Sequence, residues 1–423
     1  MDNLSLYIHI PFCVRKCHYC DFLSAPCEEE TKQRYVDALC KEITQKAEEF
    51  QDKKVDTIFF GGGTPSILSA EQMEQIVSTV RQHFQILSNA EISMEMNPGT
   101  VDREKLETYR KLGINRLSIG LQSANNEELK ILGRIHTWED FLQTWEMVRE
   151  TGFSNVNIDL MSALPGQTME SYEETLKKVL TLKPEHISAY SLIIEEGTQF
   201  YKWFEEECEG QEEQAGPKNP TDANDGLSIR KDKKLPDEIT DRKMYELTKE
   251  MLEQKGYYRY EISNYALPGY ECKHNIGYWK RKEYLGLGLG AASLLFEDTI
   301  EMQKENIRCS NVQDLKCYLN ICNGEEREKK QQSPKYSWIE EQTKLSLSDQ
   351  MEEFMFLGLR MMEGVSPTEF EEKFGKSLQE VYGEQLAKLE KQKLIVFHEE
   401  TGKYALTLQG LDVSNQVFVE FID

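Results

Sequence analysis

The first two hundred residues alternate six times between an apolar, strand-like run and a charged segment of helical length. The strand-like runs span residues 4–10, 55–60, 91–96, 116–119, 155–160 and 186–194, and the helical segments include 30–50, 70–84 and 169–182. Consecutive strand–helix units predict a parallel sheet with helices outside it. Because such crossovers are right-handed, the sheet should curl toward a barrel. Six units rather than eight predict an α/β fold with an open, three-quarter (β/α)6 barrel. A flat doubly wound sheet remains the alternative.

Three cysteines follow the first strand-like run in a Cys-x3-Cys-x2-Cys pattern: Cys13, Cys17 and Cys20. A cluster of four irons normally takes four thiolates, one per iron, so three thiolates leave one iron open to a small molecule. The alternatives are a zinc site or reduced thiols that cluster without a ligand. A zinc site usually has a partner pair of cysteines further along the chain, and no second Cys-x2-Cys pair occurs here. The spacing therefore favours an iron–sulfur cluster with one open iron.

Charge and composition exclude several other functions. The formal net charge is −24, from 74 acidic against 50 basic residues, which argues against nucleic-acid binding as a main activity. The chain enters a strand by residue 4, which leaves no room for a signal peptide. No apolar run approaches the roughly 18 residues that span a membrane. We therefore expect a cytoplasmic protein with reduced thiols and no membrane span.

The pattern changes after residue 204, and we place the end of the first domain there, at 1–204. Residues 205–237 are acidic and poor in apolar side chains, which predicts a mobile insertion whose simplest role is a surface loop. Residues 238–325 return to helical and strand-like patterns, with a helix at 241–255 and an aromatic strand at 256–265. We expect this part to extend the barrel.

The C-terminal region, 340–423, is predicted to be mostly helical and to end in a hairpin that turns at Thr401 and Gly402. Helices followed by a hairpin resemble a winged helix. The helix at 377–393 mixes glutamates and lysines, so it lacks the basic face that a DNA-binding helix needs. We expect this domain to pack against protein.

Polar residues gather where the strands of the barrel should end. Residues 61–66, Gly-Gly-Gly-Thr-Pro-Ser, follow the second strand, and glycines there let the backbone approach a ligand. Glu95 and Asp159 end the third and fifth strands, Gln122 follows the fourth, and Arg134 lies twelve residues further on. Sites form at these strand ends in β/α barrels. Carboxylates, an amide and a guanidinium suit a ligand with a zwitterionic aminoacyl group and a ribose diol.

Several segments together resemble a known group. They are Tyr-Ile-His-Ile-Pro-Phe-Cys, Gly-Gly-Gly-Thr-Pro-Ser, Glu-Met-Asn-Pro, Ile-Gly-Leu-Gln-Ser and Asp-Leu-Met-Ser-Ala-Leu-Pro-Gly-Gln. Over nearly the whole chain they are similar to the oxygen-independent coproporphyrinogen III oxidase group of radical S-adenosylmethionine (SAM) proteins. The resemblance implies a [4Fe-4S] cluster that passes an electron to the sulfonium of SAM, with release of methionine and a 5′-deoxyadenosyl radical. It implies SAM contacts from Tyr7, Tyr19, Gly62, Gly63, Thr64, Glu95, Gln122, Arg134 and Asp159.

Two departures separate this chain from the oxidases of the group. The cysteine loop of the oxidases has the pattern Cys-x3-Cys-x2-Cys-x-Cys. In this chain Phe22 stands at the position of the fourth cysteine of that pattern. They also have an extension of some tens of residues before the first motif, whereas Tyr7 is preceded by six residues. Both features resemble the HemW branch, whose members are haem chaperones rather than decarboxylases.

The segment His-Asn-Ile-Gly-Tyr-Trp resembles a motif associated with haem in that branch. It implies haem contacts from His274, Tyr278 and Trp279, with Cys272 as a second candidate ligand. Histidine can ligate haem iron, and aromatic rings can pack on the macrocycle. The alternative is that His274 is a loop residue and that the two aromatic residues belong to the core.

We therefore expect a haem chaperone that binds a [4Fe-4S] cluster, SAM and haem as cargo and passes haem to respiratory acceptor proteins. We expect radical SAM machinery without coproporphyrinogen oxidase activity. The alternatives are oxidative decarboxylation of coproporphyrinogen III and radical chemistry on haem itself. The sequence leaves the oligomeric state open, a homodimer included.

Overall fold

A mixed sheet of twelve strands runs through the computed structural model, which describes residues 3–208, 234–298, 304–322 and 338–422. The strand order is β12-β11-β10-β9-β1-β2-β3-β4-β5-β6-β8-β7. The first six strands are β1 (Leu4–Ile10), β2 (Lys54–Gly62), β3 (Gln85–Met96), β4 (Arg116–Gln122), β5 (Val156–Ser162) and β6 (His186–Ser191). The others are β7 (Tyr258–Arg259), β8 (Asn264–Ala266), β9 (Tyr284–Leu287), β10 (Ala292–Asp298), β11 (Lys304–Asn311) and β12 (Ile339–Lys344).

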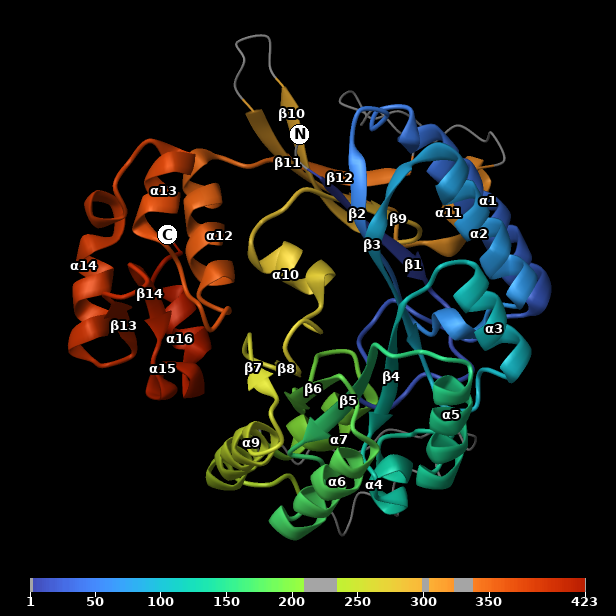
Figure 1. Ribbon diagram of the computed structural model, residues 1–423, viewed down its shortest axis with the longest axis horizontal. Helices are drawn as coiled ribbons and strands as arrows, with labels where there is room; N and C mark the ends of the chain where they lie inside the picture. The colour runs from blue at the N-terminus through green and yellow to red at the C-terminus, as the bar shows by residue number, and fades with distance from the viewer. Residues whose placement is uncertain (1–2, 209–233, 299–303, 323–337, 423) are drawn as a thin grey trace.

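Strands β1 to β6 are parallel and lie side by side in chain order. The helices between them cover the outside of the curved sheet (Figure 1). They are α1 (Glu29–Ala47), α2 (Ala70–His83), α3 (Arg103–Lys111), α4 (Asn126–Ile131), α5 (Trp138–Glu150) and α6 (Met169–Leu182). A doubly wound sheet would reverse its strand order at a switch point. The unbroken order confirms the open (β/α)6 barrel and shows that the flat-sheet alternative is wrong.

Alternation along β1 explains why the barrel has a polar interior. Leu4, Leu6 and Ile8 have no exposed surface and belong to the large hydrophobic core. Successive strand residues point to opposite faces, so Tyr7 and His9 point away from these apolar side chains. Apolar side chains thus pack under the helices, while polar ones face the inside of the barrel.

Strands on both sides extend the six-stranded unit. β9 pairs in parallel with β1 and is followed by antiparallel β10, β11 and β12, while β8 and β7 are antiparallel additions beside β6. The prediction of one strand over 256–265 is wrong, because that segment forms two short strands. The Glu261 side chain accepts a hydrogen bond from the backbone N–H of Ser263 (3.0 Å), which stabilises the bend between them.

The predicted boundary at residue 204 is also wrong, because helix α7 (Gln199–Cys208) continues through it. The rest of the predicted insertion as far as residue 233 lies outside the described residues. Helix α9 (Glu238–Glu253) begins three residues before the predicted 241. Asp237 explains this start, since its side chain accepts a hydrogen bond from the N–H of Thr240 (2.8 Å) and caps the helix.

The C-terminal region forms helices followed by a hairpin, as predicted, around its own core. Its elements are α12 (Leu347–Gly358), α13 (Pro367–Phe374), α14 (Leu378–Lys391), β13 (Ile395–His398), β14 (Lys403–Leu406), α15 (Leu408–Asp412) and α16 (Ser414–Val419). The helix α10 (Lys273–Trp279) lies between this domain and the barrel strands (Figure 1). The short helix α11 (Leu315–Cys322) packs against α1. Across the described ranges, no helix is both long and apolar enough to cross a membrane.

Candidate functional site

Backbone hydrogen bonds hold the cysteine loop, residues 11–25, at the C-terminal end of β1. The N–H of Cys13 donates to the carbonyl of Ala25 (3.2 Å), and the N–H of His18 donates to the carbonyl of Leu132 (3.0 Å). The N–H of Phe200 on α7 donates to the carbonyl of His18 (2.9 Å). The first bond closes the loop on itself, and the other two fix its middle to the end of α4 and to α7. The three thiols are half-buried.

The predicted residues Thr64 and Arg134 each contact a cysteine of this loop. The Thr64 hydroxyl lies 3.4 Å from the Sγ of Cys13, and Nη1 of Arg134 donates to the Sγ of Cys17 (3.6 Å). Asn97 joins the two: its Nδ2 donates to Thr64 Oγ1 (2.8 Å), and its Oδ1 accepts from Arg134 Nη2 (2.7 Å). Residues from four loops therefore form one connected chain across the mouth of the barrel.

The glycine-rich turn needs glycine at two positions. Gly62 has a φ of +109°, and a Cβ there would lie 2.4 Å from the ring of His9. A Cβ on Gly63 would lie 2.5 Å from the carbonyl oxygen of Phe12. Glycine tolerates the positive φ at Gly62 and leaves room for the close contacts at both positions. The turn thus packs directly against the start of the cysteine loop, where the sequence predicted a ligand-binding segment.

Two half-buried carboxyl groups face the same interior. Glu95 accepts a hydrogen bond from the N–H of Gly62 (3.2 Å), and Asp159 accepts bonds from Ser118 and Asn157. Burial, and then the nearby charge of Asp159, raises the pKa of Glu95 to about 8. Burial also raises the pKa of Asp159. Two like charges in one desolvated space disfavour ionisation, so the pair is suited to a cationic ligand that relieves the repulsion.

The other predicted SAM contacts border the same space. The Tyr7 hydroxyl lies 3.0 Å from Nδ1 of His9. Tyr19 packs on the Phe200 ring, with the centroids 6.5 Å apart. Gln122 ends β4 with a φ of +73°, which is uncommon for a residue with a side chain. Backbone strain of this kind persists where the surrounding structure imposes it and is often found at functional sites.

The donor set at the loop fits a four-iron cluster. Cys13, Cys17 and Cys20 are free thiols. Within the described ranges, no three histidine, cysteine, aspartate or glutamate side chains converge as the ligands of one metal ion do. A four-iron cluster takes one thiolate per iron, so its ligands stand apart from one another. Burial raises the pKa of the Cys20 thiol to about 11, and metal binding is the event that removes such a proton.

The predicted haem residues lie elsewhere, deeper in the barrel. The ring of His274 is bonded on both sides, by Thr57 Oγ1 at Nδ1 (2.8 Å) and by the Tyr278 hydroxyl at Nε2 (3.0 Å). The N–H of His274 donates to Glu91 (3.1 Å), and the residue is 1% exposed. Burial lowers its pKa to about 3, so the ring is neutral near pH 7. These are the contacts of a packed residue on helix α10, not of the loop residue that the alternative from the sequence described.

The depth of this layer follows from the strand register. Thr57 lies four residues before Gly61 on β2, and Glu91 lies four before Glu95 on β3. At roughly 3.3 Å per residue, the His274 layer is about 13 Å below the mouth. Cys272 is equally enclosed, 1% exposed and 3.6 Å from a Glu91 oxygen. The haem contacts stay a prediction, and iron binding by His274 would require its ring to leave these bonds.

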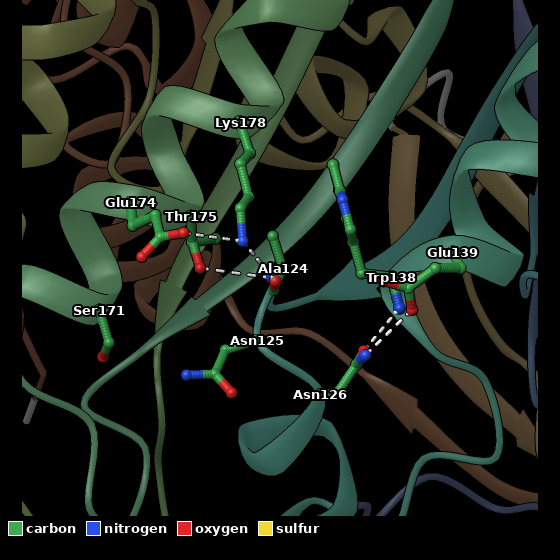
Figure 2. Close-up of a pocket in the computed structure, with 9 residues that line it drawn as sticks. All are labelled: Ala124, Asn125, Asn126, Trp138, Glu139, Ser171, Glu174, Thr175 and Lys178. Atoms are coloured by element: carbon green, nitrogen blue, oxygen red, sulfur yellow. Dashed lines mark hydrogen bonds and ion pairs between the residues drawn. The ribbon is translucent and has the colours of Figure 1, made fainter.

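A polar pocket of about 210 Å³ lies outside the barrel, between α4, α5 and α6 (Figure 2). Asn126 bonds to the N–H of Trp138 (2.7 Å) and to Glu139 (3.0 Å) at its edge. Lys178 pairs with Glu174 (3.0 Å). The residues that line it include none of the predicted site residues, and these polar groups already bind one another.

Three residues in or near the cysteine loop were not predicted as site residues: His9, His18 and Asn97. Nε2 of His9 contacts the carbonyl of Leu23 (2.9 Å), and Nδ1 of His18 contacts the carbonyl of Ile131 (2.9 Å). All three lie inside or beside the sequence motifs, and this position was the signal by which they could have been found. Their partners are distant in sequence, so their roles were not visible from spacing.

The family models match two parts of the chain. Residues 7–179 match the radical SAM superfamily, and residues 345–413 match the HemN C-terminal domain. The fold is similar to that of a solved coproporphyrinogen III oxidase (HemN) from Escherichia coli, described as a radical SAM enzyme. The TM-score is 0.76 over 99% of this chain and 90% of the other, with 24% identity. At that identity the likeness shows the fold alone.

Curated relatives cover nearly the whole chain. A protein named "Heme chaperone HemW" from Lactococcus lactis is 36% identical over 418 residues, 99% of this chain and 97% of the relative. One of the same name from Bacillus subtilis is 34% identical over 419 residues, 99% of each chain. The chain therefore belongs to the radical SAM superfamily and, within its oxygen-independent coproporphyrinogen III oxidase group, to the HemW family.

Proposed function

We propose that this protein is a cytoplasmic haem chaperone of the HemW type, which binds a [4Fe-4S] cluster, SAM and haem and passes haem to respiratory acceptor proteins. The observation that carries the proposal is the similarity, over almost the full length of both chains, to curated proteins named haem chaperones. Phe22 supports it. It is 59% exposed in the cysteine loop, at the position of the fourth cysteine of the oxidases.

In this proposal Cys13, Cys17 and Cys20 hold the cluster, and the bound cluster and SAM supply electron transfer to the sulfonium. The protein's part is to hold SAM beside the loop and exclude water. The aminoacyl group would face the Gly62–Gly63 turn. The remaining contacts would come from Tyr7, Tyr19, Thr64, Glu95, Gln122, Arg134 and Asp159.

Oxidative decarboxylation of coproporphyrinogen III is the second candidate. The match of residues 345–413 to the HemN C-terminal domain favours it. Both functions use the same cluster and SAM site, so they differ in the porphyrin that is bound and in whether it is altered. The three cysteines and the carboxyl pair do not separate them, whereas Phe22 in the cysteine loop favours the chaperone.

Porphyrin conversion separates the two functions. Anaerobically reconstituted protein is incubated with SAM, a reductant and coproporphyrinogen III, and the products are analysed for protoporphyrinogen IX. We expect tight haem binding, followed by absorbance titration, and no conversion. Protoporphyrinogen IX at many turnovers per protein would refute the chaperone function. Haem transfer is then measured by mixing the haem-loaded protein with an apo b-type cytochrome.

Single substitutions locate the haem. His274→Gln and Cys272→Ser are compared with His398→Gln, which changes an exposed histidine on β13. Loss of the haem spectrum in one of the first two variants, with far-UV circular dichroism unchanged, would identify the ligand. Unchanged haem spectra in both would show that haem binds elsewhere.

A further inference from the structure

We propose that Asn97 is a positioning residue, which aims two hydrogen-bond donors at two of the cluster thiolates. The inference rests on the proposed binding of a cluster and SAM, and it holds for a chaperone and an oxidase alike. Asn97 directly follows β3. Among the described residues, its side chain bonds to Thr64 and Arg134 and not to a cysteine, but both of these partners contact one.

The chemistry of the partners fixes the orientation of the Asn97 amide. Arginine has only donors, so the amide oxygen must face Arg134, whose Nη2 lies 2.7 Å away. The amide nitrogen therefore faces Thr64 and donates to its Oγ1 at 2.8 Å. The assignment of oxygen and nitrogen thus follows from the hydrogen-bond partners.

This orientation directs the Thr64 proton toward Cys13. With Asn97 donating to Oγ1, the hydroxyl hydrogen is free to point elsewhere, and the Sγ of Cys13 lies 3.4 Å away. A thiolate that binds iron has no hydrogen of its own, so the hydroxyl must be the donor. On the other side, Nη2 of Arg134 donates both to Asn97 and to the carbonyl of Gly120, and these bonds hold the guanidinium so that Nη1 reaches the Sγ of Cys17 (3.6 Å).

Neighbouring residues hold Asn97 in place through its backbone. The N–H of Asn97 lies 3.4 Å from Ser66 Oγ, and its carbonyl accepts from the Thr100 hydroxyl (2.7 Å). On β4, a Cβ at Gly120 would lie 2.8 Å from Oδ1 of Asn97 and 3.3 Å from Nη2 of Arg134. Gly120 therefore leaves the room that the amide–guanidinium contact needs.

Hydrogen bonds to the sulfurs of an iron–sulfur cluster are among the factors that set its reduction potential. Donors stabilise the more negative, reduced state. Removing Asn97 should therefore shift the midpoint potential to more negative values. Because Arg134 is also a proposed SAM contact, SAM affinity should fall by about 2- to 10-fold, the factor that one ordinary hydrogen bond contributes.

The test compares anaerobically reconstituted full-length wild type with Asn97→Ala. Iron and sulfide content is measured first, then the midpoint potential by redox titration followed by electron paramagnetic resonance, and then the SAM-induced change of that spectrum. Asn126→Ala is the matched control, because its amide also bridges two partners but lies at the outer pocket (Figure 2). We expect a negative shift and weaker SAM binding in Asn97→Ala only.

A second variant tests the inference in case Asn97→Ala binds its cluster poorly. Gly120→Ala leaves Asn97 and Arg134 in the chain but places a methyl group against both side chains, and it should shift the potential in the same direction. If Asn97→Ala or Gly120→Ala holds its cluster and has the wild-type potential and SAM affinity, the inference about Asn97 is overturned, and the proposed function is not. A wild-type protein that holds no cluster would overturn the proposed cofactor as well, so the two failures are distinguishable.

Discussion

Replacing Glu95 with glutamine should remove most of the pH dependence of SAM binding between pH 6 and 8. Glu95 is bonded to the N–H of Gly62, and burial together with Asp159 raises its pKa to about 8. The carboxyl group is therefore mostly protonated at neutral pH without a ligand. A positive sulfonium nearby favours the ionised form, so binding should release a proton from Glu95.

The expected magnitude follows from the ionised fraction. With a pKa of about 8, Glu95 is ionised in roughly 1% of molecules at pH 6, about 9% at pH 7 and about half at pH 8. If binding requires the ionised form, affinity rises about ninefold from pH 6 to 7 and about fivefold from pH 7 to 8. The amino group of SAM titrates near this range, but it does so equally in wild type and variant.

Titration calorimetry of cluster-loaded protein, in buffers of different ionisation enthalpy, measures both the affinity and the protons released. Glu95→Gln should bind SAM with little change over this range, apart from the titration of SAM itself. Glu104→Gln, on the exposed side of α3, is the control for loss of one carboxylate. A wild-type affinity that is flat from pH 6 to 8, or an equal slope in Glu95→Gln, would refute the reasoning.

Three further predictions concern other parts of the chain. Glu353→Ala leaves buried Arg281 without its partner at 2.8 Å, so the free energy of unfolding in urea should fall by about 3 kcal/mol; a change below about 0.5 kcal/mol would contradict this. Wild-type stability should decline as pH falls below about 6.5, since unfolded His274 takes a proton that the folded state, with a pKa of about 3, refuses; thermal melts of His274→Gln should show a shallower decline. Phe22→Cys should give no protoporphyrinogen IX in the conversion assay, and its appearance would mean that this position limits oxidase activity.

Local sequence patterns were sufficient to predict the strands and helices that form the barrel. Strand β1 and helix α6 have the bounds that the sequence predicts, 4–10 and 169–182, because their apolar periodicity begins and ends sharply. The prediction of one strand over residues 256–265 was wrong, because the local pattern there does not show where the strand is interrupted. The aromatic residues of this segment favour a strand throughout, but the Glu261 side chain binds the N–H of Ser263 and stabilises a bend. A side-chain bond of this kind overrides propensity.

The sequence by itself determined the six strand–helix units, the cysteine loop after the first strand and the polar strand ends, because each of these depends on neighbours along the chain. Only the tertiary structure decided what the side chains contact. His274 meets Thr57 across 217 residues, and Arg134 meets Cys17 across 117. Such contacts depend on which strands become neighbours and how deep each side chain lies. For that reason Asn97 emerged as the link between two cysteine partners, and His274 as a residue packed inside the barrel.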